Sequence, residues 1–253
     1  MNNPVFIGGL MKSGTSLLRK LVSLHPNIYG GLETHWFSNE FRNHWNDEEF
    51  STRIKWLFEF YEISETEANQ IRHKASSSED FFGSFMTYCT KKSGKKRWVE
   101  KTPDNVFHLN EIFEYWENAK VIIMKRNFMD IFASWKRNNK GDVDSFIIKA
   151  RHFLDVIDQY EDDNRVLFIN YNELVTEPRR NLELILEFLD EPFIPGMEDY
   201  QGDSEDYSKV LNVTGKISAT TESLSKPIFT TSIDSWKEVL SREEVKFINQ
   251  LNV

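Results

Sequence analysis

Near its amino terminus the chain reads PVFIGGLMKSGTSLLR over residues 4–19. The first half is a short apolar run typical of a strand, and the second half reads as a helix that opens on glycine and hydroxyl residues. The backbone N–H groups of the loop and of the first helical turn have no partner within the helix. The helix dipole adds partial positive charge there, so the pattern predicts a phosphate site.

The side chains of this loop suit the same role. Gly14 lets the backbone approach an anion closely, and Lys12 supplies a full positive charge. Hydroxyl donors come from Ser13, Thr15 and Ser16. A nucleotide triphosphatase loop places its lysine after the last glycine, with a magnesium-binding hydroxyl beside it. Here the lysine precedes the glycine, so we expect its ammonium to enter from the strand side. The structural alternative is an ordinary strand–loop–helix with a capping hydroxyl.

Apolar runs and helical segments alternate along the rest of the chain. Strands are expected at 5–8, 28–31, 98–101, 121–124 and 166–169, and helices at 15–24, 105–116, 128–137, 143–160 and 179–189. This alternation predicts one α/β domain over residues 1–253, P-loop-like, with a central parallel sheet flanked by helices. Residues 40–95 form a helical insertion rich in aromatic side chains, which either cover an acceptor site or are simply core. Residues 196–232 are polar and predicted to be loop-rich.

Composition excludes several classes of protein. A formal net charge of −9 argues against non-specific binding to nucleic acid or to an anionic membrane. Cys89 is the only cysteine, so no intrachain disulfide is possible. No targeting signal and no run of about 20 apolar residues appears. We therefore expect a cytoplasmic protein with neither nucleic-acid nor membrane partners. The sequence does not fix the oligomeric state.

A second anion-binding pattern follows the apolar run 121–124. Arg126 stands at the end of the predicted strand, where its planar guanidinium matches a phosphate. Ser134 follows two helical turns later and can close the other side of the same site. The structural alternative is that Arg126 pairs with Asp130 and that Ser134 is a plain helical residue.

With both motifs in place, the chain resembles the sulfotransferases that use 3′-phosphoadenosine 5′-phosphosulfate (PAPS). Their 5′-phosphosulfate loop reads Lys/Arg-Ser-Gly-Thr-Ser/Thr-Leu-Leu/Met-Arg, and their 3′-phosphate motif is an arginine at a strand end with a serine eight residues later. The resemblance runs from Pro4 to about Leu240 and is closest to the tyrosylprotein and bacterial carbohydrate-type branch. Three further segments agree with it: EKTPDN at 100–105, YNELV at 171–175, and the pairs 226–227 and 236–237.

The resemblance implies an activity and a set of site residues. It implies metal-independent, in-line transfer of a sulfuryl group from PAPS to an acceptor hydroxyl, on a glycan, a small metabolite or tyrosine. The product would be 3′,5′-adenosine bisphosphate (PAP), and residues 196–232 would close over the cofactor. Lys12 and Lys101 would stabilise charge in the transition state. The implied cofactor-binding residues are Lys12, Ser13, Gly14, Thr15, Ser16, Arg126, Ser134, Tyr171, Thr220 and Lys226.

The catalytic base is expected in the segment that follows the second strand. Glu33 lies twenty-one residues after Lys12, the spacing of the catalytic glutamate in the tyrosylprotein branch. Its structural alternative is an acid that merely complements a helix dipole. His35 is the alternative base, by the chemistry of its ring. We expect His35 and Trp36 to contact the acceptor.

The chain also departs from that branch, and two other functions compete. Ser235 stands where the branch has a lysine before the tryptophan, so the contact that closes over the cofactor is in doubt. A P-loop nucleotide kinase would need the other lysine order and a magnesium-binding acid. A catalytically silent nucleotide-binding protein would have no need for the charged groups named above.

Overall fold

The computed structural model describes residues 3–37, 42–47, 50, 52–202, 208–209, 211–212, 215 and 219–251. Its centre is a five-stranded parallel sheet in the order β2-β3-β1-β4-β5. The strands are β1 (Val5–Gly9), β2 (Ile28–Gly30), β3 (Arg97–Lys101), β4 (Lys120–Lys125) and β5 (Val166–Asn170). The predicted fold class, a single domain with a central parallel sheet flanked by helices, is confirmed.

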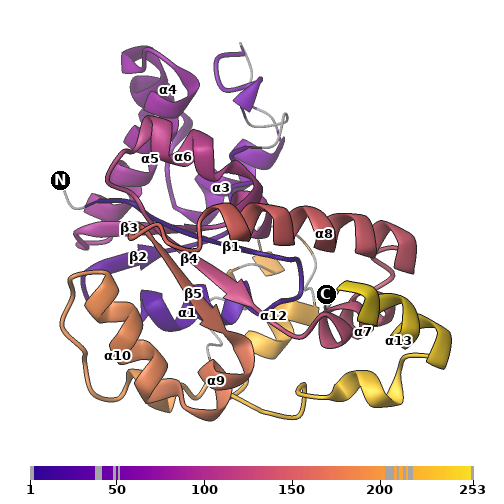
Figure 1. Ribbon diagram of the computed structural model, residues 1–253. Helices are drawn as coiled ribbons and strands as arrows, with labels where there is room; N and C mark the ends of the chain where they lie inside the picture. The colour runs from indigo at the N-terminus through magenta and orange to yellow at the C-terminus, as the bar shows by residue number, and fades with distance from the viewer. Residues whose placement is uncertain are drawn as a thin grey trace.

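Helices cover both faces of this sheet (Figure 1). On one face lie α1 (Thr15–Ser23), α9 (Tyr171–Thr176) and α10 (Pro178–Phe188). The other face carries α3 (Thr52–Phe60), α4 (Glu65–Lys74), α5 (Ser78–Lys92), α6 (Leu109–Tyr115), α7 (Phe128–Arg137), α8 (Val143–Gln159) and α13 (Arg242–Ile248). Short elements complete the chain: α12 (Ala219–Leu224) and the 3-10 turns η1 (Pro103–His108), η2 (Met197–Asp199), η3 (Ser235–Glu238) and η4 (Asn249–Leu251).

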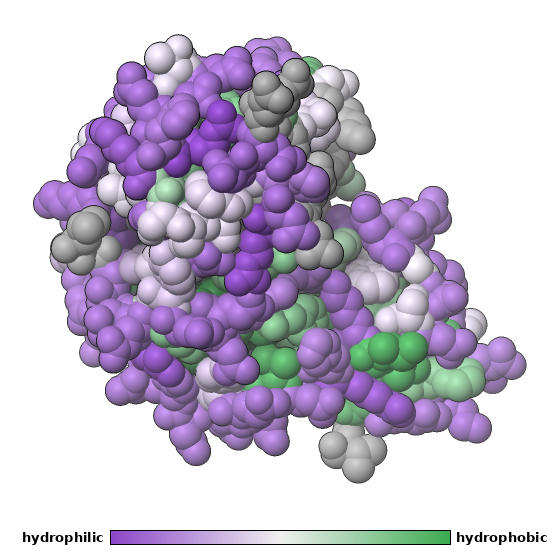
Figure 2. All heavy atoms as spheres, turned by 90° about the horizontal axis from the view of Figure 1, so that it is seen from above, coloured by the Kyte–Doolittle hydropathy of each residue, from purple (hydrophilic) through white to green (hydrophobic). Residues whose placement is uncertain are grey.

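Burial on both faces explains the continuous apolar runs of the strands. Along β1, Phe6 packs into the cluster under α3–α8, while Val5 and Ile7 pack against α1 and α10. In β4 the odd residues Val121 and Ile123 likewise belong to the first cluster. Successive side chains of a strand point to opposite faces, so a strand covered on both sides must be apolar throughout. The surface outside this core is largely hydrophilic in the view of Figure 2.

Helix starts follow local capping chemistry. The Asn127 side chain accepts a hydrogen bond from the backbone N–H of Met129 at 2.8 Å, and α7 occupies the predicted residues 128–137. The predicted helix at 105–116 is instead a 3-10 turn from Pro103 followed by α6, because proline fixes the first turn and α6 begins only at Leu109. The other predicted boundaries differ by one or two residues.

The aromatic segment 40–95 is mainly core. Phe81, Phe82 and Phe85 are fully buried, and the ring of Phe58 packs against that of Phe85. The alternative that these side chains are simply core therefore describes most of them; residues 38–41, 48, 49 and 51 lie outside the described chain. Among the described residues, no helix is both long and apolar enough to cross a membrane.

Candidate active site

The loop between β1 and α1 lies at the carboxyl edge of the sheet. Its backbone turns sharply, with Lys12 and Gly14 in the left-handed region at φ 77° and 108° and a hydrogen bond of 2.9 Å from the Ser13 N–H to the Leu10 carbonyl. Gly14 is also the N-cap of α1, and the first turn of that helix contains no acidic residue. The amino end of α1 therefore presents uncapped N–H groups and the positive end of its dipole to the loop.

Gly14 is required here for space as well as for its backbone angle. A Cβ at this position would lie 2.4 Å from Cδ2 of Tyr171, the first residue of α9. The Tyr171 hydroxyl in turn lies 2.7 Å from the Ser232 hydroxyl, where either can donate. The phosphate loop, α9 and the carboxyl-terminal segment thus pack on one another.

Lys12 reaches across this edge. Its ammonium donates to the hydroxyl of Thr220 in α12 at 3.1 Å, so two residues predicted to bind the cofactor are in direct contact. Burial lowers the pKa of Lys12, and the charges of Lys140 and Lys101 lower it further, although Glu33 opposes the shift. The protein therefore holds an ammonium where positive charge is already crowded.

Lys101 ends β3 and joins the loop to the predicted base. Its side chain is 3% exposed; it donates to the Ser16 hydroxyl at 2.9 Å and forms an ion pair with Glu33. The second carboxylate oxygen of Glu33 lies 3.1 Å from Nε2 of His35, whose side chain is 45% exposed. Burial alone would raise the pKa of Glu33, but the Lys101 charge and the His35 and Lys101 hydrogen bonds outweigh it and hold the pKa well below its usual range.

Arg126 lies at the end of β4, between the phosphate loop and the carboxyl-terminal segment. Its guanidinium donates to the Lys12 carbonyl at 3.1 Å and to the Ser232 carbonyl at 2.8 Å, and it lies 4.1 Å over the Tyr171 ring. Asp130 does not pair with it. That carboxylate instead accepts from the Asp234 and Trp236 N–H groups and holds η3 in place. Ser134 is half-buried on α7.

The donors at this edge fit a multiply charged anion such as the phosphates of PAPS. The Ser13 hydroxyl is completely buried and has no hydrogen-bond partner within the described part of the chain, and the same is true of Arg126 Nε. Buried polar groups are normally satisfied, so two orphaned donors beside two ammonium groups and an uncapped helix end indicate a site for phosphate oxygens.

Two of the predicted site residues, Trp36 and Lys226, do not take part in the contacts described above. Trp36 is completely buried and its ring stacks on Phe82 at 4.5 Å, so its ring belongs to the core and is not presented to an acceptor. Lys226 is 58% exposed and pairs with Glu222 at 3.4 Å. Lys237, beside the tryptophan of the closing segment, pairs with Asp234 at the surface.

Sequence reasoning overlooked Glu100, which lies beside Lys101 in β3. Its side chain is 1% exposed and accepts hydrogen bonds from three residues, Thr34, Thr102 and Asn105. The EKTPDN segment contained the signal, because a carboxylate in a buried strand, directly before the predicted catalytic lysine, requires donors around it.

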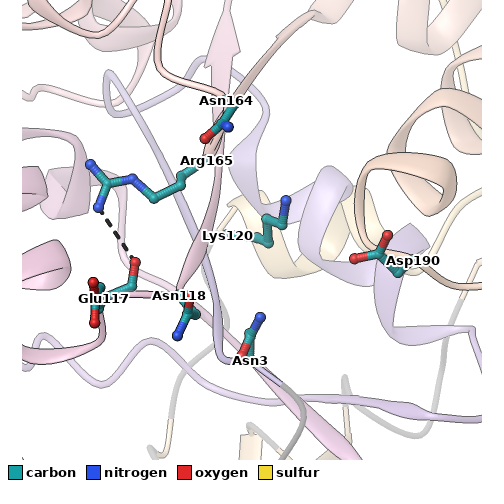
Figure 3. Close-up of a pocket in the computed structure, with 7 residues that line it drawn as sticks. All are labelled: Asn3, Glu117, Asn118, Lys120, Asn164, Arg165 and Asp190. Carbon is teal, nitrogen blue, oxygen red and sulfur yellow. Dashed lines mark hydrogen bonds between the residues drawn. The ribbon is translucent and has the colours of Figure 1, made fainter.

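A pocket of about 400 Å³ lies at the opposite edge of the sheet (Figure 3). Its lining comes from the amino ends of the strands, the turns before them and the residue after the C-cap of α10: Asn3, Glu117, Asn118, Lys120, Asn164, Arg165 and Asp190. One Arg165 nitrogen donates to the Glu117 carbonyl at 3.4 Å, as the dashed line marks. None of the predicted site residues lines it, and in parallel α/β sheets ligands bind at the carboxyl ends of the strands.

Comparison with known proteins agrees with this geometry. The model of the Sulfotransferase family matches residues 4–195. The chain belongs to the sulfotransferase family. It is 24% identical over 250 residues to a protein-tyrosine sulfotransferase of Drosophila melanogaster, covering 92% of this chain and 46% of the relative. It is 26% identical over 204 residues to protein-tyrosine sulfotransferase A of Caenorhabditis elegans, covering 75% and 50%. The chain thus spans about half the length of these curated relatives.

Solved sulfotransferase structures share the fold. The sulfotransferase domain of the Synechococcus olefin synthase superimposes with a TM-score of 0.69 at 18% identity, covering 100% of this chain and 96% of that domain. The sulfotransferase domain of the curacin biosynthetic pathway gives 0.63 at 19% identity, covering 100% and 98%. Membership of this family favours the predicted sulfotransferase over the P-loop kinase and the silent nucleotide-binding protein.

Proposed function

We propose that this sulfotransferase family member transfers a sulfuryl group from PAPS to an acceptor hydroxyl and releases PAP, without a metal. The observation that carries the proposal is the convergence of Lys12 and Lys101 on the uncapped amino end of α1, with Glu33 beside them. When bound, PAPS supplies an electrophilic sulfuryl group on a phosphate leaving group. The chain supplies the charge, the orientation and the proton acceptor.

Cofactor binding is assigned to two groups of donors. The N–H groups around Gly14, with the hydroxyls of Ser13, Thr15 and Ser16, would hold the 5′ side. Arg126, whose Nε is buried without a described partner, would hold the 3′-phosphate together with Ser134. A guanidinium presents two donors in one plane and suits a phosphate better than an ammonium does.

Charge stabilisation is assigned to the two lysines. In-line transfer increases negative charge on the leaving oxygen, and preorganised cations in a buried site stabilise that charge strongly. Lys101 is well suited to this task because it is buried and because one of its two described partners, the Ser16 hydroxyl, is neutral. A phosphate oxygen can replace a hydroxyl with a gain in Coulomb energy.

Proton removal is assigned to Glu33, with His35 as the alternative base. In the free protein the ion pair with Lys101 keeps Glu33 ionised and makes it a weak base. An anion that draws Lys101 away would remove that pairing and raise the pKa of Glu33. The base would then gain strength only when the cofactor is present.

The acceptor hydroxyl would lie next to Glu33 and the half-exposed His35. Tyrosine is the acceptor class to test first, because both relatives described above are named protein-tyrosine sulfotransferases. A glycan hydroxyl and a hydroxyl of a small metabolite are the other classes. The net charge of −9 favours a neutral or cationic acceptor over a polyanionic one.

Calorimetric titration with PAP tests the cofactor, with 5′-AMP and ATP–magnesium as controls. We expect tight binding of PAP and weak binding of both controls, because only PAP engages Arg126 through a 3′-phosphate. A preference for ATP–magnesium, or no binding at all, would overturn the proposal. Labelled PAPS with tyrosyl peptides, glycans and small alcohols then identifies the acceptor.

A further inference from the structure

The carboxylate of Glu100 is the centre of a buried hydrogen-bond network next to Lys101. Its Oε1 accepts from the Thr34 N–H at 3.0 Å, from the Thr34 hydroxyl at 2.9 Å and from the Thr102 hydroxyl at 2.8 Å. Its Oε2 accepts from the Asn105 amide at 2.6 Å. All four residues are at most 5% exposed, so the network is sealed from solvent.

This network connects the two halves of the candidate catalytic pair. Thr34 lies between Glu33 and His35, and Glu100 directly precedes Lys101. The Thr102 hydroxyl that donates to Glu100 also accepts from the His35 N–H at 3.1 Å. His35 has a left-handed backbone at φ 53°, which an L-residue adopts only at a cost. The hydrogen bonds to Thr102 and Glu100 stabilise that turn.

The same carboxylate is tied to the strand that leads into the phosphate loop. Asn105, which donates to Glu100, also donates to the Ile7 carbonyl of β1 at 3.1 Å. Two adjacent strands and the 34–35 turn are therefore connected through the Glu100 carboxylate and the Asn105 amide. A shift of any of them would leave a buried polar group unsatisfied.

We propose that Glu100 is a positioning residue for sulfuryl transfer: it fixes the 33–35 turn against the end of β3 that carries Lys101, so that the proton acceptor and the lysine start from a defined arrangement when the cofactor binds. The inference rests on the proposed function of this site. Glu100 itself lies too deep to touch the cofactor or the acceptor.

An ionised carboxylate is needed for this role, and an amide is not an equivalent. Four donors converge on Glu100, and a glutamine would turn an NH₂ group toward one of them. The charge also matters to its neighbour. Burial lowers the pKa of Lys101, and the carboxylates of Glu33 and Glu100 oppose that shift.

The test compares Glu100→Gln, Thr102→Val and the control Thr90→Val. Thr90 is also a buried threonine, but its hydroxyl donates to the Met86 carbonyl within α5, away from this network. We expect Glu100→Gln to lower kcat by about 10²-fold, the loss typical of a misplaced catalytic group. Thr102→Val should lower kcat by about tenfold, because it removes one bridging hydroxyl and no charge. Thr90→Val should leave kcat unchanged.

Two readouts separate positioning from a loss of folding. The Kd for PAP should stay within about twofold of wild type in all three variants, since the phosphate loop keeps its own hydrogen bonds. The NMR chemical shifts of the His35 ring, assigned by their loss in His35→Asn, should change in Glu100→Gln and Thr102→Val but not in Thr90→Val. This second readout needs no cofactor.

The outcomes distinguish this inference from the proposed function. Absence of PAP binding and turnover in the wild type would refute the proposed function, whatever the variants do. Normal kcat and unchanged His35 chemical shifts in Glu100→Gln, when the wild-type protein is active, would overturn the inference alone. A Glu100→Gln protein that loses kcat and PAP affinity together, while Thr102→Val is normal, would also overturn it.

Discussion

The two edges of the sheet both bury basic side chains but pair them in opposite ways. At the amino edge, Lys95 donates to three backbone carbonyls at 2.6–3.1 Å. Arg97 donates to the carbonyls of Asn3 and Leu189 and pairs with Glu191 at 3.6 Å. These partners are parts of the backbone or a nearly buried carboxylate. The charges therefore act as cross-links of the architecture.

At the carboxyl edge, the buried Lys101 and the half-buried Lys12 have exchangeable partners. Lys12 donates to the hydroxyl of Thr220 and Lys101 to that of Ser16, with Glu33 as the single carboxylate in an ion pair with them among the described residues. A hydroxyl is neutral, and an anion can displace it. Burial of a basic residue therefore does not indicate its role, whereas the chemistry of its hydrogen-bond partner does.

The largest effect is expected from removing the proposed catalytic base at the carboxyl edge. Glu33→Gln should lower kcat by about 10²–10⁴-fold, the contribution of a general base, while the Kd for PAP changes little. Steady-state kinetics with labelled PAPS and calorimetry measure the two quantities. His35→Gln is the matched control. Unchanged turnover in Glu33→Gln with loss in His35→Gln would assign the base to His35.

The next effect concerns the amino edge, where we expect a loss of unfolding free energy and no change in kcat. Arg97→Met leaves Glu191 and two carbonyls without their buried donor, which should cost about 3–5 kcal/mol of unfolding free energy. Urea titration measures that loss. The kcat of the folded fraction should equal that of wild type. A stable Arg97→Met protein with reduced kcat would show that the two edges are not distinct in role.

For Lys101→Met we expect the opposite of Arg97→Met, a large loss of kcat and a small loss of stability. Removing one preorganised cation should lower kcat by about 10²–10³-fold. Stability should fall far less than in Arg97→Met, because the Ser16 hydroxyl loses only a neutral contact and Glu33 is one-third exposed to water. Thermal unfolding of both variants, side by side with kinetics, tests this. Equal destabilisation of the two would mean that Lys101 is a cross-link like Arg97.

The order of strands and helices and the charged site residues could be predicted from the sequence, but the hydrogen-bond partners of those residues could not. The strand 121–124 could be predicted because a continuous apolar run is a local signal, and so could the helix 128–137 that follows it. The burial of Trp36 and the network around Glu100 depend on contacts between residues distant in the chain. Thr34 and Glu100 are 66 residues apart, and no local pattern encodes that hydrogen bond.

The predicted phosphate site shows the same limit of prediction from sequence. The loop 12–16 and Arg126 were predicted from residue type and spacing, and the structure brings both to the carboxyl edge of the sheet. That Arg126 lies between the Lys12 and Ser232 carbonyls could not be predicted, because it depends on how the carboxyl-terminal segment folds back. Asp130 holds this segment by accepting a hydrogen bond from the Asp234 N–H. From the sequence alone, a pairing of Asp130 with Arg126 was the structural alternative.

The smallest expected effect is the uptake of a fraction of a proton by Lys12 when PAP binds. Burial and the nearby lysine charges lower the pKa of Lys12, so part of it is deprotonated at a pH where an ordinary lysine stays charged. A bound phosphate favours the charged form and raises that pKa again, so PAP binding above neutral pH should take up a fraction of a proton. Calorimetry in the alkaline range below the ordinary lysine pKa of about 10.4, in two buffers of different ionisation enthalpy, measures the uptake.

Two arginine variants identify the residue that takes up the proton. Lys12→Arg should reduce the uptake, because arginine stays charged over this range. Burial also lowers the pKa of Lys95, but its partners are carbonyls at the other edge, so Lys95→Arg should leave the uptake unchanged. Uptake that falls in Lys95→Arg and persists in Lys12→Arg would contradict the assignment. Lys95, at the amino edge of the sheet, would then be the residue that takes up the proton. In that case the distinction between exchangeable partners at the carboxyl edge and fixed partners at the amino edge would fail.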